Sequence, residues 1–208
     1  MNSSYILRMK FKYYLLIFIL LFARGCDFYS TSLWFFDNPT GEQNFFYRIF
    51  GFGWSALLVS NAIIVALIIY CYYYYSFKYQ LSPPTEKSYS ITDYVSLRYF
   101  KKKGLFHQVF YKLPTDKKTG IGHFGYVMIR VAIVGSFLAT FHNLCQFYNI
   151  DAYNNFRELV GRPLWVIYGL ILASFIFFQY RLWKKEFELS RQLDEKAVTA
   201  ENGLVTRD

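Results

Sequence analysis

The residues best suited to chemistry in this sequence are polar side chains near one end of its apolar segments. Arg24 closes the first apolar segment, and His142 and Asn143 lie near the end of the third. Arg48 and Arg157 stand in the loops that follow these segments. Arginine and histidine at a membrane surface can bind a phosphate or carboxylate, helped by the N-terminus of a neighbouring helix. The sequence therefore predicts an outer-face site for an anion or a lipid headgroup, with simple anchoring in the headgroup layer as the alternative.

Two of the three cysteines, Cys26 and Cys145, fall beside these residues. We expect them at equal depth outside the cytoplasm, where a disulfide can form if their Cα atoms come within about 7 Å. Cys71 is expected to face a reducing compartment and to remain a thiol. A second interpretation makes Cys26 the lipidated first residue of a mature lipoprotein, because a basic start and a short apolar core precede it. Ala23 and Arg24 fit such a signal poorly, so we favour an uncleaved helix.

The histidines do not predict a cofactor site. A membrane haem usually needs two histidines that face each other, but His107 falls in a loop, and His123 and His142 stand at opposite ends of one apolar segment. No cluster of His, Cys and carboxylates has the spacing of metal ligands. The sequence also has no Walker loop, serine-hydrolase elbow or CxxC pair. We therefore expect no cofactor and no metal, and an enzyme is the less favoured class.

The triplet Gly51-Phe52-Gly53 has the glycine pattern of a potassium-channel filter. A filter needs a threonine at the start of its carbonyl ladder, and Ile49-Phe50 stand there instead. Trp54 follows at once and leaves no length for an outer mouth. We expect the triplet to be a flexible start to the next helix.

Apolar segments must position all of these residues. Of the 208 residues, 54% are hydrophobic and 23% aromatic, which is typical of a membrane protein. Three segments have the ~20 residues needed to cross ~30 Å of hydrocarbon. The first has eleven apolar residues and spans only if the flanking basic side chains reach the headgroups. The predicted fold class is all-α and polytopic, with transmembrane helices at about 9–26, 53–76, 124–147 and 163–181.

Basic residues predict the orientation. The loop 78–122 carries nine Lys or Arg against three acidic residues, and Arg8, Lys10 and Lys12 precede the first span. By the positive-inside rule this loop and both termini are cytoplasmic. The predicted location is a bacterial inner membrane, as a multi-pass protein. Because orientation accounts for most of the +9 net charge, we do not expect nucleic acid as a partner.

An internal repeat is visible when residues 20–29 are written over residues 139–148. Cys26 then matches Cys145, and residues 44–54 match 154–165 with a tryptophan in each. The repeat predicts two parallel hairpins related by an axis along the membrane normal. They comprise residues 1–77, with an outer loop at 27–50, and residues 123–183. Coincidence between two aromatic belts is the alternative.

The loop 78–122 has the pattern of two short amphipathic helices. Ser90 or Thr92 is expected to cap the first, Gly104 to end it, and Pro114 to stop the second. Basic side chains beside them form a membrane-surface patch for anionic inner-leaflet lipids, with single-stranded RNA as the alternative. This patch consists of Lys101, Lys102, Lys103 and Lys112.

Residues 184–208 are predicted to form a cytoplasmic helical tail. Its charges nearly balance, and a partial apolar stripe suits docking or self-association. The stripe begins just before the tail and consists of Leu182, Phe187, Leu189 and Leu193.

Two functions remain open at this point. The favoured one is a non-catalytic integral membrane component, acting as a pore-forming, regulatory or assembly subunit. It would work in the lipid bilayer as a homo-oligomer or with a membrane-complex partner. The alternative is a small carrier or thiol-redox membrane enzyme whose outer-face site surrounds His142, Cys26 and Cys145.

Overall fold

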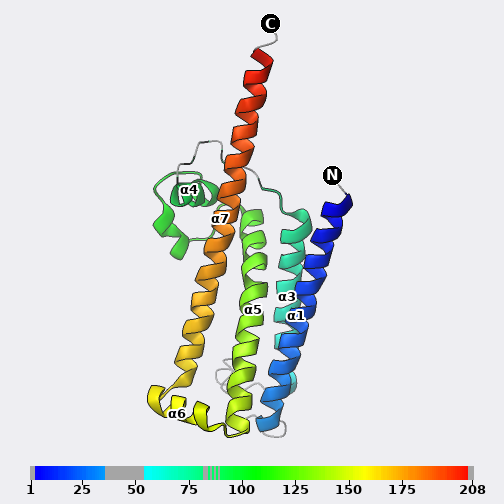
Figure 1. Ribbon diagram of the computed structural model, residues 1–208, viewed down its shortest axis with the longest axis vertical. Coiled ribbons are helices and arrows are strands. Elements are labelled where there is room, and N and C mark those ends of the chain that lie inside the picture. Colours follow the sequence, from blue (N-terminus) through cyan, green and yellow to red (C-terminus); the bar gives the residue numbers. More distant parts are fainter. Residues whose placement is uncertain are drawn as a thin grey trace.

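A computed structural model describes residues 3–35, 54–81, 84, 86, 88 and 90–205 of the chain (Figure 1). These residues form helices and their connections, without a strand. Four helices are long and apolar enough to cross a membrane: Met9–Leu33, Ser55–Lys78, Lys117–Phe147 and Pro163–Glu195. The predicted all-α class and the four candidate spans are confirmed.

Helix α5 (Lys117–Phe147) is the centre of the bundle. Helices α1 (Ser3–Phe35), α3 (Trp54–Tyr73) and α7 (Pro163–Val205) all pack against it. By contrast, α1 makes few contacts with α3, its predicted hairpin partner. The hairpin arrangement therefore stays unconfirmed. Helix α3 begins at Trp54, as the sequence predicts, whereas Gly51 to Gly53 lie outside the described residues.

Close packing against α5 depends on small residues and aromatic rings. A Cβ atom on Gly125 would lie 2.2 Å from the backbone carbonyl of Cys71, so only glycine lets α3 approach α5 here. The buried cluster around this seam is apolar and aromatic, and it consists of Tyr13, Leu20, Ile68, Tyr72 and Ile129. Because these side chains come from α1, α3 and α5, the cluster joins three of the four candidate spans.

The first span is longer than the sequence predicted. Helix α1 continues through Cys26 to Phe35, whereas the prediction ended it near residue 26. The reason is a local ion pair, in which Arg24 Nη1 lies 2.9 Å from Asp27 Oδ2 one turn later. Opposite charges one turn apart neutralise each other, so they disfavour an apolar helix less than two separate charges would.

The bundle has two distinct ends. Both chain termini lie at the end that carries helix α4 (Ile91–Phe100), which we call the α4 end (Figure 1). The opposite end carries α6 (Asp151–Val160), a short helix that the sequence did not predict, and we call it the α6 end. That the α4 end is cytoplasmic stays a prediction from the basic residues.

Helix α4 is capped by Ser90, whose hydroxyl accepts a hydrogen bond from the Asp93 amide at 3.1 Å. The helix ends at Phe100, before the predicted Gly104, because Lys101 takes a left-handed conformation with φ of 60°. The second predicted helix is only a 3₁₀ turn, Phe106–Phe110. The buried side chains of α4 pack with Trp183 of α7, so protein covers the face that we expected to lie on lipid.

Helix α7 joins two predicted elements into one. Its 43 residues run unbroken from Pro163 to Val205, which corresponds to a length of about 64 Å. This is about twice the thickness of the hydrocarbon core. The predicted span 163–181 and the predicted tail are therefore one helix, which projects past the other elements at the α4 end (Figure 1).

Candidate functional site

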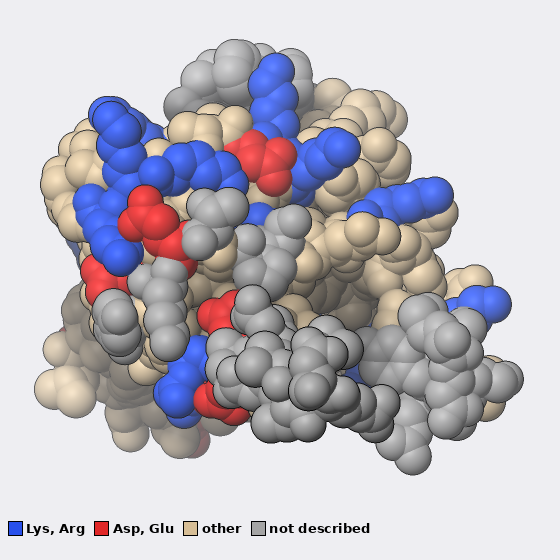
Figure 2. Space-filling view, turned by 90° about the horizontal axis from the view of Figure 1, so that it is seen from above, with Lys and Arg blue, Asp and Glu red and all other residues tan. Residues whose placement is uncertain are grey.

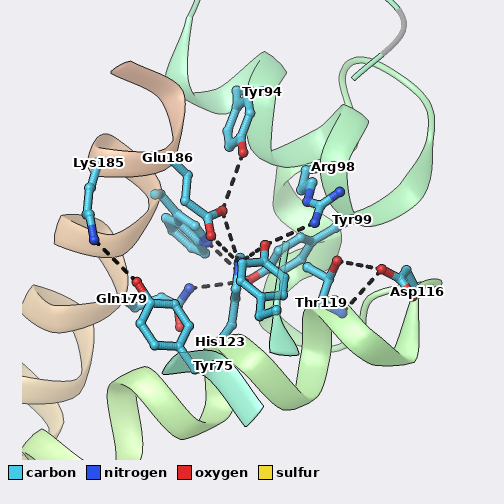
Figure 3. Close-up of polar contacts among 12 residues, drawn as sticks. Tyr75, Tyr94, Arg98, Tyr99, Asp116, Thr119, His123, Gln179, Lys185 and Glu186 are labelled. Atoms are coloured by element: carbon cyan, nitrogen blue, oxygen red, sulfur yellow. Dashed lines mark hydrogen bonds and ion pairs between the residues drawn. The ribbon is translucent and has the colours of Figure 1, made fainter. Parts of the chain in front are cut away.

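A buried polar cluster lies where α4, α5 and α7 meet at the α4 end (Figure 3). We call it the His123 cluster, and it consists of Tyr79, Tyr94, Arg98, Tyr99, His123 and Glu186. His123 is 3% exposed, Arg98 4% and Glu186 5%. Charged side chains are almost never this buried unless they have partners, so the cluster is the most unusual feature of the described chain.

The hydrogen bonds to Tyr99 fix the tautomer of His123. The Tyr99 oxygen accepts from Trp183 Nε1 at 3.1 Å and from Gln179 Nε2 at 3.2 Å. These two bonds occupy both lone pairs, so the Tyr99 hydroxyl proton is donated to His123 Nδ1, 2.6 Å away. His123 Nδ1 then accepts, and its Nε2 donates to Glu186 Oε2 at 3.0 Å.

Glu186 accepts hydrogen bonds from three residues that lie in α4, in α5 and in the connection after α3. Besides His123 of α5, its carboxylate accepts from the Tyr94 hydroxyl at 3.4 Å and from the Tyr79 hydroxyl. Arg98 supplies the compensating positive charge, because its Nη2 donates to the Tyr79 oxygen at 3.0 Å. One buried carboxylate and one buried guanidinium thus share a single hydrogen-bond network with His123.

The tyrosines of the cluster outside the candidate spans remain protonated donors. Burial, reinforced by the Glu186 charge, raises the pKa of Tyr79 and Tyr94 far above the usual range. Burial likewise raises the pKa of Tyr99. Burial alone would lower the pKa of Arg98, but Tyr79 and its neighbours outweigh it and raise that pKa. The network therefore keeps its donors over the physiological pH range.

This arrangement holds elements together and does not expose a reactive group. All six residues are hydrogen-bonded to other members of the cluster. His123 and Glu186 are too buried for a substrate to reach them without rearrangement. Tyr94, Arg98 and Tyr99 belong to α4, whereas His123 and Glu186 belong to α5 and α7. The cluster thus ties α4 to the bundle, as a polar counterpart to the packing around Trp183.

A second polar group, the Arg24 cluster, lies within the candidate spans. Arg24 Nη1 bonds Asp27 at 2.9 Å and the Ser136 hydroxyl of α5 at 3.2 Å, and Nη2 bonds the Asn61 side-chain oxygen of α3. Ser136 is 1% exposed and Asn61 8%. Arg24 was predicted to bind an outer anion, but its charge is already matched by Asp27 inside the protein.

His142 and Asn143 also face protein partners. Gln146 donates to His142 Nε2 at 2.6 Å, so the ring proton lies on Nδ1 and faces the hydroxyl of Tyr153 in α6. Asn143 donates to Ser30 at 3.2 Å and to Thr31 at 3.1 Å. His142 therefore fastens α6 to α5, and Asn143 fastens α1 to α5.

The structure brings only part of the predicted outer site together. Arg157, an exposed residue of α6, lies within electrostatic range of His142. Arg24 makes its contacts with α1, α3 and α5, and Asn143 makes its contacts with α1. Arg48 lies outside the described residues. Anion binding by this set stays a prediction.

Cys26 and Cys145 are free thiols at different heights in the bundle. The hydrogen-bonded pairs between α1 and α5 lie 112 or 113 positions apart, whereas Cys145 follows Cys26 by 119 positions. The two cysteines are therefore offset by about 10 Å along the helix axes. The disulfide stays a prediction, and it would require α1 and α5 to slide by about two turns.

The predicted basic patch is exposed at the α4 end, where Lys and Arg side chains gather (Figure 2). Lys103 lies 3.4 Å from the Glu86 carboxylate, and Lys112 donates to Gln108 at 3.1 Å. Lys101 and Lys102 are also exposed. Lipid binding by this patch stays a prediction.

Comparison with protein families, curated proteins and solved structures gives no match to this chain. Function must therefore be argued from the geometry of its own residues.

The sequence did not reveal the His123 cluster. His123 stood out only as one of three histidines, and Glu186 only as one charge in a balanced tail. One signal was present, since Glu186 follows Leu182 by four positions and so falls on the apolar face of the same helix. The tyrosines gave no signal, because 20 tyrosines occur in this chain.

Proposed function

We propose that the chain is a non-catalytic integral membrane component that works by self-association of its projecting helix, as a regulatory or assembly subunit. The observation that carries this proposal is the continuity of α7. One helix includes a candidate span, contributes Glu186 to the His123 cluster and continues beyond the bundle to Val205. A displacement of the projecting part would therefore act directly on the buried cluster and on α4.

The projecting part of α7 has a surface suited to another helix. Leu189 and Leu193 are 42% and 41% exposed and lie one turn apart on one face. An isolated helix of this length is marginal in water, and burial of an apolar stripe against a partner stabilises it. Burial of this stripe would therefore favour association of the projecting helix with another helix.

The charges of this segment favour a second copy of the chain as the partner. Lys184 lies 4.0 Å from Glu188, and Arg191 lies 3.7 Å from Glu195, so these two cations each have an acid on their own helix. The polar face therefore needs no oppositely charged partner. Two copies related by a twofold axis can place their leucines together without like charges at the seam.

The mass of the purified protein in lipid nanodiscs tests this proposal. The variant Leu189→Gln/Leu193→Gln is expected to be monomeric where the wild type is a dimer, since it removes the apolar stripe and adds no charge. The variant Leu189→Met/Leu193→Met is the matched control, because it keeps an apolar face of similar volume. A monomeric wild type, or a dimer in all three proteins, would contradict self-association through this face.

The alternative, a carrier or thiol-redox enzyme with an outer site, draws support from one observation. Arg24 and Asp27 are charged residues within a candidate span, and such residues often mark a transport path. Under this alternative, alanine substitution of His142, Arg48 or Arg157 should abolish the cellular function, and Arg157 discriminates best because His142 also fastens α6 to α5. Under the proposal above, Arg157→Ala leaves the function intact because its side chain is exposed and holds no element in place.

A further inference from the structure

Three cations from three different helices converge near the α4 end, beside the His123 cluster, to which the stacked rings of Tyr75 and Tyr79 connect them. They are Lys12 of α1, Arg130 of α5 and Lys185 of α7. Lys185 lies within electrostatic range of both Arg130 and Lys12. Among the described residues, none of the three is ion-paired with a carboxylate, and Glu186 beside Lys185 is held by His123. Three cations near one carboxylate, which already accepts a hydrogen bond from His123, leave an excess of positive charge that favours an anionic ligand.

Tyrosine rings set the positions of these cations. The Arg130 guanidinium lies 3.7 Å from the centre of the Tyr126 ring and 5.8 Å from that of Tyr72. Tyr72 stacks on Tyr13 at 5.6 Å, and Tyr13 follows Lys12 in α1. On the other side, Tyr126 meets the Tyr75 ring at 4.9 Å. A row of rings therefore connects the α1, α5 and α7 parts of the group.

Lys185 completes the row from α7. Its Nζ donates to the Tyr75 hydroxyl at 3.5 Å, and Figure 3 shows the side chain extended toward that ring. Arg130 donates to the backbone oxygen of Tyr126, one turn nearer the α4 end, so its charge is directed toward the membrane surface at that end. Lys12 and Lys185 are exposed, which leaves the site open to a ligand from outside.

We propose that Lys12, Arg130 and Lys185 form a binding site for a phosphate group, supplied by an anionic phospholipid of the adjacent leaflet. Arginine and lysine bind phosphate oxygens by charge-assisted hydrogen bonds, and the tyrosine belt marks the depth at which headgroups lie. Basic sites between transmembrane helices at the leaflet surface suit such headgroups. This site is separate from the patch of Lys101, Lys102, Lys103 and Lys112.

The test titrates the full-length protein in a zwitterionic detergent with phosphatidylglycerol, phosphatidylcholine or inorganic phosphate, and follows the melting temperature. Phosphatidylglycerol is expected to raise the melting temperature and phosphatidylcholine to leave it unchanged. In the variant Lys12→Gln/Lys185→Gln, we expect phosphatidylglycerol to bind roughly 30-fold more weakly, at about fivefold per charge.

The matched control is Lys10→Gln/Lys184→Gln, which also removes one positive charge from α1 and one from α7. Both residues are exposed, and Lys184 faces Glu188 on its own helix. We expect this control to bind phosphatidylglycerol as the wild type does. An equal loss of affinity in the two variants would show a diffuse charge effect and would overturn the site.

The remaining arms identify the source of the phosphate. A melting temperature that rises with inorganic phosphate but not with phosphatidylglycerol would overturn the lipid assignment. Equal stabilisation by phosphatidylcholine would overturn the requirement for an anion. The variant Arg130→Gln, if folded by circular dichroism, should lose binding as the double variant does, and retained affinity would exclude Arg130 from the site.

Discussion

The His123 cluster and the Arg24 cluster solve the same problem, a charge inside protein, in different ways. Arg24 meets its acid three residues away on the same helix, and its bonds to other helices go to neutral side chains. Glu186 and Arg98 come from α7 and α4, and they are joined through Tyr79, with His123 on the other side of the carboxylate. The Arg24 charge is neutralised within its own helix, whereas neutralisation of the Glu186 charge at the α4 end depends on the tertiary fold.

That difference predicts which cluster is more sensitive to loss of one member. Glu186→Ala leaves Arg98 buried without its compensating charge and leaves three donors without an acceptor, so we expect a loss of about 3–5 kcal/mol in unfolding free energy. Unfolding by sodium dodecyl sulfate in mixed micelles measures this. Glu188→Ala is the control, an exposed acid two positions later on the same helix, and it should change stability by less than about 0.5 kcal/mol. Similar losses in both variants would mean that the cluster does not bear on stability.

The Arg24 cluster is expected to tolerate removal of both charges better than removal of one. Arg24→Leu removes the positive charge 2.9 Å from Asp27 within a candidate span, which should cost about 2–3 kcal/mol in the same assay. Arg24→Leu/Asp27→Leu removes both charges and should recover most of that loss. If the double variant is less stable than Arg24→Leu, the pair is not the local compensation described above.

Asp116 gives the smallest expected effect, because it is a local cap without deep burial. Its carboxylate accepts from the Thr119 hydroxyl at 2.7 Å and from the Lys118 and Thr119 amides at the start of α5. Asp116→Ala should therefore cost about 1 kcal/mol, and Asp116→Asn less.

The pH dependence of this cap follows from the same bonds. The Thr119 hydroxyl bond, with the amide bonds, lowers the pKa of Asp116 below its unfolded value. The stabilisation is therefore fully present above the unfolded pKa of about 3.9 and is lost as pH falls through the lower folded-state pKa. A wild type that loses no more stability than Asp116→Ala between pH 5 and pH 2 would contradict this assignment.

Local signals in the sequence predicted the elements better than their contacts. Hydropathy predicted four candidate spans, and the Ser90 cap and the Trp54 helix start follow from short-range rules. The end of α1 was placed too early because Arg24 was treated as an unpaired charge. Helix α6 was missed because its amphipathic pattern lies in a segment treated as a loop.

The site residues show the same limit. His142 and Asn143 were recognised as polar residues in an apolar helix, but their partners Tyr153 and Ser30 depend on how α6 and α1 pack. The His123 cluster joins residues that lie far apart in the sequence, such as Tyr94 and Glu186, which are 92 positions apart. Periodicity in one sequence does not say which helices meet, so no local rule finds such a pair.

Cross-linking of α7 tests the central claim, self-association of the projecting helix, most directly. In a background where Cys26, Cys71 and Cys145 are replaced by alanine, single cysteines are introduced at residues 188, 189, 191 and 193 and oxidised in the membrane. Leu189→Cys and Leu193→Cys should give a disulfide-linked dimer, since equivalent positions meet across a twofold axis. Glu188→Cys and Arg191→Cys, on the far side of the helix, should remain monomeric. Equal cross-linking at all four positions, or none at residues 189 and 193, would contradict the proposed association.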